Sequence, residues 1–161
     1  MRKTYRGAMP HASVTQPRCS IARTMQVLGE KWTVLIVRSA FQGDSRFSEF
    51  RDRLGVPTDV LSARLTTLVD AGIFERRSYK EAGSRERSSY HLTEAGSELK
   101  KVLAALSEWG TAHRASEFGP SVLYVDGNSD EVSVEFVSAS GSTLECADVT
   151  MVPGPGATTT W

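Results

Sequence analysis

Apolar residues along the chain recur mostly with the 3.6-residue period of amphipathic helices. The repeats predict helices over about residues 20–28, 31–40, 49–54 and 58–71, and a last long helix after Thr93. The helix-forming stripes contain Ile21, Met25 and Leu28; Trp32, Leu35, Ile36 and Ala40; Phe50 and Leu54; Leu61, Leu65 and Leu68; and Leu99, Val102, Leu103, Leu106 and Trp109.

Capping residues and turns sharpen these boundaries. Ser48, Thr58 and Thr93 are each expected to be N-caps, because their side-chain oxygens can accept a hydrogen bond from the first turn of a helix. Glycines are expected to stop helices at Gly29 and Gly72. Gly-Val-Pro at 55–57 separates two helices by a short turn, which is the spacing of a helix-turn-helix motif.

Strand patterns are shorter. Residues 73–79 and 88–92 have high β-propensity and flank a polar loop, 80–87, so they predict a hairpin with a long tip. Farther along, residues 122–125, 132–136 and 149–152 contain apolar runs or alternation that predict a small β-meander.

The fold class that follows is mainly α with a small β-hairpin wing, a winged helix-turn-helix, plus a short C-terminal β-rich extension. We expect three regions. Residues 1–18 form a flexible basic N-terminal arm, residues 19–116 form the DNA-binding and dimerisation domain, and residues 119–161 form an acidic extension.

The distribution of charge supports this division. The 161 residues carry 19 Lys and Arg and 19 Asp and Glu, so the formal net charge is zero. Residues 1–38 nevertheless hold seven basic groups and one acid, whereas residues 119–161 hold six acids and no Lys or Arg. A neutral total therefore does not argue against a polyanionic partner.

Several classes of protein are disfavoured. The chain lacks the G-x-S-x-G, P-loop, H-E-x-x-H and C-x-x-C motifs, so we predict no enzyme activity and no cofactor. Its longest aliphatic run is far shorter than the roughly 18 residues of a membrane span. Because two cysteines cannot build a disulfide framework and no secretory signal is visible, the expected location is the cytoplasm.

The helix from Thr58 is the candidate DNA-reading element. Its outward face is small and polar, so it can approach base edges in a major groove about 12 Å wide. Arginines are the candidates for phosphate or minor-groove contact, because their planar fork is always charged. The candidate DNA-binding residues are Thr58, Ser62, Arg64, Thr66, Arg76, Arg77, Arg85 and Arg87. Two alternatives stay open: a solvated helix face, and a hairpin held by its own ion pairs.

Two further sites are expected. The apolar face of the last helix, with Leu99, Leu103, Leu106 and Trp109, predicts a dimer interface, although packing on its own core is the alternative. Cys19 precedes the first helix, where helix dipoles and nearby arginines favour a thiolate, so it is a candidate redox sensor. Its alternative role is that of a small buried apolar side chain.

The ordered motifs of the chain resemble the HxlR family of MarR-like transcription regulators over about residues 19–113. The segments that carry the resemblance are Cys19–Arg23, Leu28–Trp32, Arg46–Phe50, Leu61–Leu65, Leu68–Ile73, Tyr90–Gly96 and Trp109–Gly110. The resemblance implies a homodimer with the helix from Thr58 as recognition helix. It also places Cys19 at the position of a cysteine that senses oxidants or electrophiles in some members.

The extension is similar to one in some relatives in which cysteine pairs suggest a small metal-binding module. Here only Cys146 remains, so we predict no metal. The predicted function is a homodimeric transcriptional regulator, favoured as a repressor, that binds a pseudo-palindromic operator and answers to a redox or small-molecule signal. The alternative is a winged-helix module for protein interaction or ligand binding without specific DNA binding.

Overall fold

The computed structural model describes residues 17–80, 83 and 85–157. Four helices come first: α1 (Ser20–Leu28), α2 (Lys31–Phe41), α3 (Phe47–Leu54) and α4 (Thr58–Asp70). The hairpin of β1 (Phe74–Tyr79) and β2 (Arg87–Leu92) follows, and then α5 (Glu94–Glu98) and α6 (Lys100–His113). Most of the expected N-terminal arm, 1–18, and part of the hairpin tip lie outside the described residues.

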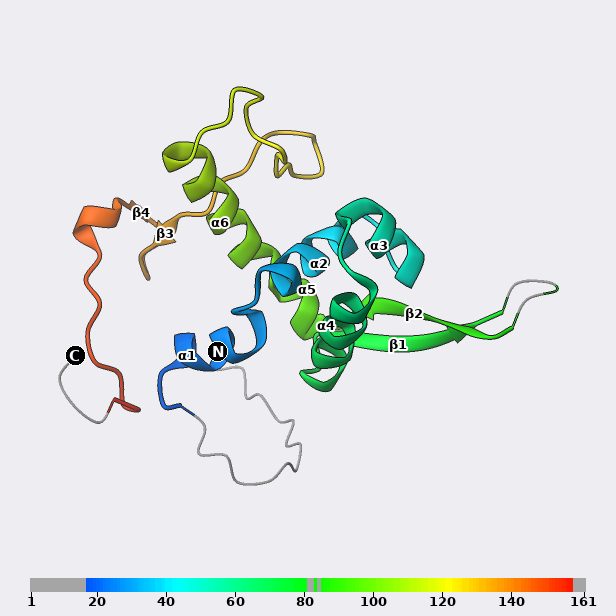
Figure 1. Cartoon of the computed structure of the whole chain (residues 1–161). Coiled ribbons are helices and arrows are strands. Elements are labelled where there is room, and N and C mark those ends of the chain that lie inside the picture. Colours follow the sequence, from blue (N-terminus) through cyan, green and yellow to red (C-terminus); the bar gives the residue numbers. More distant parts are fainter. Residues whose placement is uncertain (1–16, 81–82, 84, 158–161) are drawn as a thin grey trace.

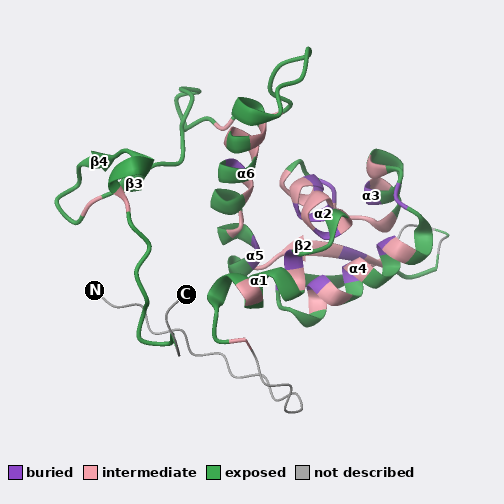
Figure 2. Cartoon of the chain, turned by 60° about the vertical axis from the view of Figure 1, so that its left-hand side comes forward, coloured by how far each residue is buried: buried purple, intermediate pink, exposed green. Residues whose placement is uncertain are grey.

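The core lies where α2, α3, α4 and the base of the hairpin meet (Figures 1 and 2). Phe50 and Phe74 are its largest buried side chains, with ring centroids 6.2 Å apart. Ile36 of α2 and Leu61 and Leu65 of α4 are likewise fully buried. The core is thus built from the helical stripes that the sequence predicts.

Two of the three expected N-caps are wrong. Ser48 lies inside α3, whose N-cap is Arg46, and the Glu49 side chain accepts a hydrogen bond of 2.8 Å from the Arg46 backbone N–H. Thr58 is the first residue of α4 and follows Pro57, whose fixed φ places the extended cap one residue earlier. Thr93 caps α5 as expected, since its Oγ1 accepts from Gly96 N at 3.0 Å.

The long last helix that the sequence predicts is divided at Leu99 into α5 and α6. The Leu99 N–H donates to the Gly96 carbonyl three residues earlier, a 3₁₀-type contact that tightens the turn. Gly96 is buried, and a Cβ there would lie 2.2 Å from the Ile73 carbonyl oxygen. Close packing on the hairpin therefore fixes the short α5 before α6 leaves the body.

The C-terminal extension contains less strand than the sequence predicts. The strands are β3 (Phe136–Val137) and β4 (Thr143–Leu144), which pair antiparallel, and a bridge joins Val125 to Glu131. The 3₁₀ helix η1 (Cys146–Asp148) follows, and residues 149–152 form no strand. The strands of the extension pair over two positions only, which is too few to form the predicted meander.

Candidate nucleic-acid interface

Helix α4 has one buried face and one polar face. Leu61, Leu65 and Leu68 are each 0% exposed and anchor the helix in the core. The opposite side carries the exposed residues Thr58, Asp59, Ser62, Ala63 and Thr66. None of these side chains is long, so this side of the helix can lie close to the floor of a groove.

Two hydroxyls on α4 already bond within the helix. Thr66 Oγ1 donates to the Ser62 carbonyl at 3.0 Å, and Thr67 Oγ1 donates to the Ala63 carbonyl at 3.1 Å. A hydroxyl retains acceptor capacity after donating its proton. The exposed Thr66 can therefore accept a hydrogen bond from a base amino group without leaving its place on the helix.

The turn before α4 fixes the angle between α3 and α4. Gly55 adopts a left-handed conformation with φ of 62°, and its N–H donates to the Arg51 carbonyl at 2.8 Å. Val56 is buried in the core, and the Leu61 N–H bonds back to the Pro57 carbonyl at 2.9 Å. The two helices consequently form a rigid helix-turn-helix.

The hairpin places arginines beside α4. Arg76, Arg85 and Arg87 are exposed, with Arg87 opposite Tyr79 in the register of the two strands. Arg77 is exposed too, but it forms an ion pair with Glu75 on its own strand. Arg85 and Arg87 therefore lie toward the outer end of the hairpin, Arg76 lies nearer its base, and Arg77 has a carboxylate partner on its own strand.

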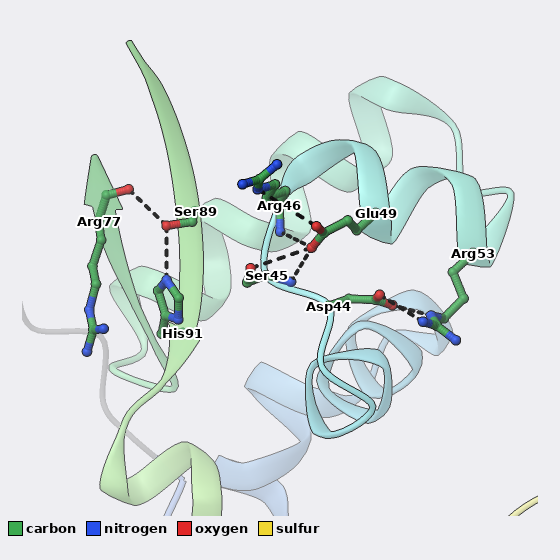
Figure 3. A network of polar contacts seen from close by, with 8 residues as sticks. All are labelled: Asp44, Ser45, Arg46, Glu49, Arg53, Arg77, Ser89 and His91. Carbon is green, nitrogen blue, oxygen red and sulfur yellow. Dashed lines mark hydrogen bonds and ion pairs between the residues drawn. The ribbon is translucent and has the colours of Figure 1, made fainter. Parts of the chain in front are cut away.

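The base of the hairpin is tied to the start of α3 (Figure 3). A bridge joins Arg46 to Ser89, and the Tyr90 N–H donates to the Ser45 carbonyl at 2.7 Å. Ser89 Oγ donates to the Arg77 carbonyl at 3.3 Å and lies 2.9 Å from His91 Nε2. The hairpin is thus joined to the start of α3 through Ser89 and Tyr90 of β2.

Glu49 supports the same junction. Its carboxylate accepts hydrogen bonds from the Ser45 and Arg46 backbone N–H groups, both at 2.8 Å. These two bonds, that from Ser45 first, hold the pKa of Glu49 below its usual value. An ionised Glu49 therefore fixes the segment on which the hairpin rests.

Asp44 braces α3 from its other end. Burial raises the pKa of Asp44, but hydrogen bonds from Arg53 and Ser39 outweigh burial, so the pKa lies below its ordinary value. Arg53 Nη2 lies 3.0 Å from Asp44 Oδ1, and the pKa of Arg53 is raised by the same contact. Figure 3 shows this pair beside the Glu49 cluster.

Sequence reasoning missed Arg46 as a residue of this surface. Its guanidinium lies over the Tyr79 ring, 4.7 Å from the ring centroid. This cation–π contact places a positive group beside Tyr79, the last residue of β1, and so links the start of α3 to the outer part of the hairpin. The signal available in the sequence was the Arg46–Phe50 segment, which had been noted only as part of a family motif.

Arg64 lies on the flank of α4 rather than on its polar face. Its side chain is 29% exposed, and Nη2 lies 4.0 Å from a carboxylate oxygen of Glu30 at the start of α2. Its Nε is buried without a hydrogen-bond partner. Arg64 thus connects α4 to α2, and of the candidate residues on α4 it is the least open to solvent.

Cys19 is exposed on the single chain and does not pack into its core. It is the N-cap of α1, where Sγ accepts a contact of 3.5 Å from the Ala22 N–H. The Arg23 guanidinium donates to the Pro17 carbonyl at 2.8 Å and to the Arg18 carbonyl at 2.7 Å. The thiol therefore stands open to solvent on a helix start braced by an arginine.

The four expected dimer residues divide into two pairs. Leu99 and Leu103 are half-buried against the core of their own chain, whereas Leu106 and Trp109 are 54% and 57% exposed. The structure also exposes Val102, which the sequence places on the stripe of the last helix, and adds Ile21 and Met25 of α1, which sequence reasoning did not assign to this face. A hollow of about 30 Å³ with an entirely apolar lining lies between α1, α2 and α6.

Among the described residues, no three His, Cys, Asp or Glu side chains gather into a group that could hold a metal ion. None of the helices in the described ranges has the length and apolar character needed to cross a bilayer.

The fold and the polar surface of α4 define a winged helix-turn-helix protein. Residues 27–118 match the model of the HxlR-like helix-turn-helix family, and the chain belongs to that family. It is therefore a transcriptional regulator with a helix-turn-helix domain.

Similar proteins agree with this assignment. An uncharacterized HTH-type transcriptional regulator of Mycobacterium tuberculosis is 35% identical over 139 residues, which cover 85% of this chain and 87% of that protein. The crystal structure of PA1607, a candidate transcription factor, is 32% identical with a TM-score of 0.73, and the match covers 84% of this chain and 95% of that one. The reduced form of the redox regulator HypR is 29% identical with a TM-score of 0.54, covering 60% and 94%.

Proposed function

We propose that this regulator binds specific DNA as a homodimer, with one α4 helix in each of two major grooves of a pseudo-palindromic operator. The observation that carries the proposal is the small polar face of α4 beside a hairpin with exposed arginines. In such a dimer the half-sites lie about 34–36 Å apart, or a multiple of that distance. Occupancy of an operator favours repression as the output.

The proposed roles of the residues follow their exposure. Thr58, Ser62 and Thr66 contact bases or adjacent phosphates, since they line the exposed side of α4. Arg76, Arg85 and Arg87 contact phosphates or the minor groove. Arg64 and Arg77 contact phosphates. To do so, Arg64 leaves or shares its ion pair with Glu30, and Arg77 leaves or shares its ion pair with Glu75.

The dimer is proposed to form through α1 and α6. Ile21, Met25, Leu106 and Trp109 are large apolar side chains that are all exposed on these helices. Association would remove this apolar surface from water, which is the main driving force of most protein–protein contacts. Leu106→Glu tests this interface better than Leu103→Glu, because Leu103 also packs against its own core.

Cys19 is proposed as the point at which an oxidant or another small-molecule effector acts. It is exposed at the start of α1, and α1 contributes Ile21 and Met25 to the proposed interface. Modification of its thiol would alter the interface and thereby the spacing of the two α4 helices. HypR, one of the similar structures, is named a redox regulator.

Selection of bound fragments from a random DNA pool, followed by sequencing, tests specific binding. The expected result is an enriched motif with two-fold symmetry. Ser62→Ala combined with Thr66→Ala should then reduce the preference for that motif about tenfold, because lost base contacts reduce discrimination. Ser97→Ala, an exposed serine on α5, is the matched control. A pool without enrichment would favour a protein-interaction or ligand-binding module instead.

The effector proposal has its own test. DNA affinity is measured before and after diamide or peroxide for the wild type and for Cys19→Ser, with Cys146→Ser as control because Cys146 is also exposed. We expect the wild type and Cys146→Ser to lose affinity on oxidation, and Cys19→Ser to keep it. Equal responses of Cys19→Ser and the wild type would remove Cys19 from the mechanism.

A further inference from the structure

The last part of the extension is largely exposed, as far as the described residues show. We name residues 136–157 the distal segment and residues 122–134 the proximal segment. In the distal segment Phe136, Val137, Met151 and Val152 are all exposed, with Met151 reaching 77%. Figure 2 shows this segment almost entirely in the colour of exposed residues, standing apart from the helical body. A stretch with this many exposed apolar side chains is typical of an interaction surface.

Helices α1 and α6 also carry exposed apolar side chains. The distal segment runs past α6 and α1 in both views, separated from them (Figures 1 and 2). Ile21 and Met25 of α1, and Leu106 and Trp109 of α6, are exposed. Apolar side chains of both the distal segment and these two helices are thus left exposed by the residues that the structure describes.

The proximal segment, which precedes the distal segment, is hydrogen-bonded to α6. The Val134 N–H donates to Glu108 Oε1 of α6 at 2.8 Å, and the Val132 N–H donates to the Tyr124 carbonyl at 2.9 Å. Tyr124 is half-buried, and burial, with the nearby Glu108 charge, raises its pKa. The chain therefore leaves α6 at a defined place, next to the exposed end of that helix.

Charge complementarity identifies the partner. The distal segment contains Glu145 and Asp148 and no Lys or Arg, and Glu135 immediately precedes it. The start of α1 carries Arg18 and Arg23, both exposed. A second copy of the chain thus offers an apolar face with a basic edge to an apolar segment with acidic side chains.

The length and the position of the distal segment allow it to contact a second copy of the chain. The 22 residues of the distal segment span at most about 70 Å when extended, several times the roughly 10–12 Å width of a helix. The hairpin and α4 lie on the other side of the body from the distal segment (Figure 1). In this arrangement the acidic segment does not cover the proposed DNA-binding surface.

We infer that the distal segment is a dimerisation strap: in the homodimer, the distal segment of each copy lies across α1 and α6 of the other copy. This inference rests on the proposed homodimer and goes beyond it, because it assigns part of the dimer contact to the extension. Two-fold symmetry makes each contact occur twice, so every substitution in the strap acts on two contacts.

Paired substitutions in the full chain test the strap. Phe136→Ser combined with Met151→Ser should raise the dimer dissociation constant at least about 100-fold, since four large apolar side chains lose their burial across the dimer. Val125→Ser is the matched control, because Val125 is also exposed, at 53%, but lies in the proximal segment. Sedimentation velocity over a range of concentrations gives the constants.

The outcomes separate the strap from the dimer itself. If Leu106→Glu yields monomers while Phe136→Ser/Met151→Ser dimerises like the wild type, the strap is overturned and the α1/α6 dimer stands. A wild-type protein that sediments as a monomer overturns both proposals.

Hydrogen exchange provides a second measurement on the unaltered chain. Amides of residues 143–152 should be protected at concentrations where the dimer forms, and should exchange faster after dilution or in the Leu106→Glu variant. Equal exchange of these amides in dimer and monomer would contradict the strap.

Discussion

The helical body and the distal segment contain apolar residues in different surroundings. In the body, Ile36, Phe50 and Leu65 are fully buried by neighbouring elements. In the distal segment, residues of similar size, such as Phe136 and Met151, remain exposed. The body places its apolar residues on helical stripes that face one another, whereas the distal segment has no second layer in its own chain. Apolar content alone therefore does not make a core; a facing partner does.

The largest expected change in stability is found by replacing one large apolar side chain with alanine in each of the two regions. Leu65→Ala should lower the free energy of unfolding by about 2–5 kcal/mol, because it opens a cavity in the core. Val152→Ala, at a site 71% exposed, should change it by less than about 0.5 kcal/mol in the monomer. Chemical denaturation at several protein concentrations measures both.

Concentration is the control in that experiment. Association of two subunits raises the apparent free energy of unfolding, and it does so more at higher protein concentration. The effect of Leu65→Ala should persist at all concentrations, whereas that of Val152→Ala should appear only where dimers form. A large effect of Val152→Ala on the dilute protein would show that the distal segment is part of the monomer fold.

Two glycines, one closely packed and one in open space, allow a second test with a smaller expected change in stability. Gly96→Ala should destabilise the protein by about 1–3 kcal/mol, because its Cβ would meet the Ile73 carbonyl oxygen at 2.2 Å. Gly110→Ala in α6 meets nothing within 4 Å and should stabilise the helix by about 0.5–1 kcal/mol. Thermal unfolding of the two variants should shift in opposite directions; shifts of the same sign would contradict the packing described for α5.

The same contrast explains what could be predicted from the sequence. The ranges of α1, α2 and α4 and of the two hairpin strands were predicted to within about a residue or two. In α2 and α4 the periodicity reflects burial in this chain, whereas Ile21 and Met25 of α1 are exposed. Strand content in residues 149–152 was overestimated, because β-propensity there has no partner strand to act upon. The caps at Ser48 and Thr58 were wrong, since Glu49 and Pro57 determine where α3 and α4 begin.

The candidate DNA-binding surface was predictable in its residue types and less so in its contacts. The exposed face of α4 follows from helical projection, and it agrees with the structure at Ser62 and Thr66. Ion pairs of Arg64 with Glu30 and of Arg77 with Glu75 depend on tertiary placement or rotamers. The Arg46–Tyr79 contact joins residues 33 positions apart, and no local pattern indicates it.

The hairpin is exposed like the distal segment but carries positive instead of negative charge. Substitutions in the hairpin are expected to weaken DNA binding and not to affect folding. Arg85→Ala combined with Arg87→Ala should weaken DNA binding about tenfold on all sequences and make the salt slope shallower by about two units. Lys101→Ala, an exposed cation on α6, should leave the slope unchanged. Fluorescence anisotropy at several salt concentrations measures the slope, and an unaltered slope in the arginine variant would remove the hairpin from the interface.

The smallest expected effect concerns the junction between the body and the hairpin, and it depends on pH. The pKa of Glu49 is lowered from 4.5 in the folded protein, so its contribution to stability is complete above pH 4.5 and is lost as the pH falls through the lower folded value. Glu49→Gln removes this contribution, because an amide oxygen accepts the bonds from Ser45 and Arg46 more weakly than a carboxylate does. Unfolding experiments should therefore show a loss of stability of roughly 1 kcal/mol or less near pH 7 and a smaller difference from wild type near pH 3. Asp52→Asn, which alters an exposed carboxylate of α3 paired with Arg51, is the matched control for removing a carboxylate from this helix. If Glu49→Gln and wild type lost stability in parallel below pH 4.5, the ionised Glu49 would not be what holds the hairpin base on α3.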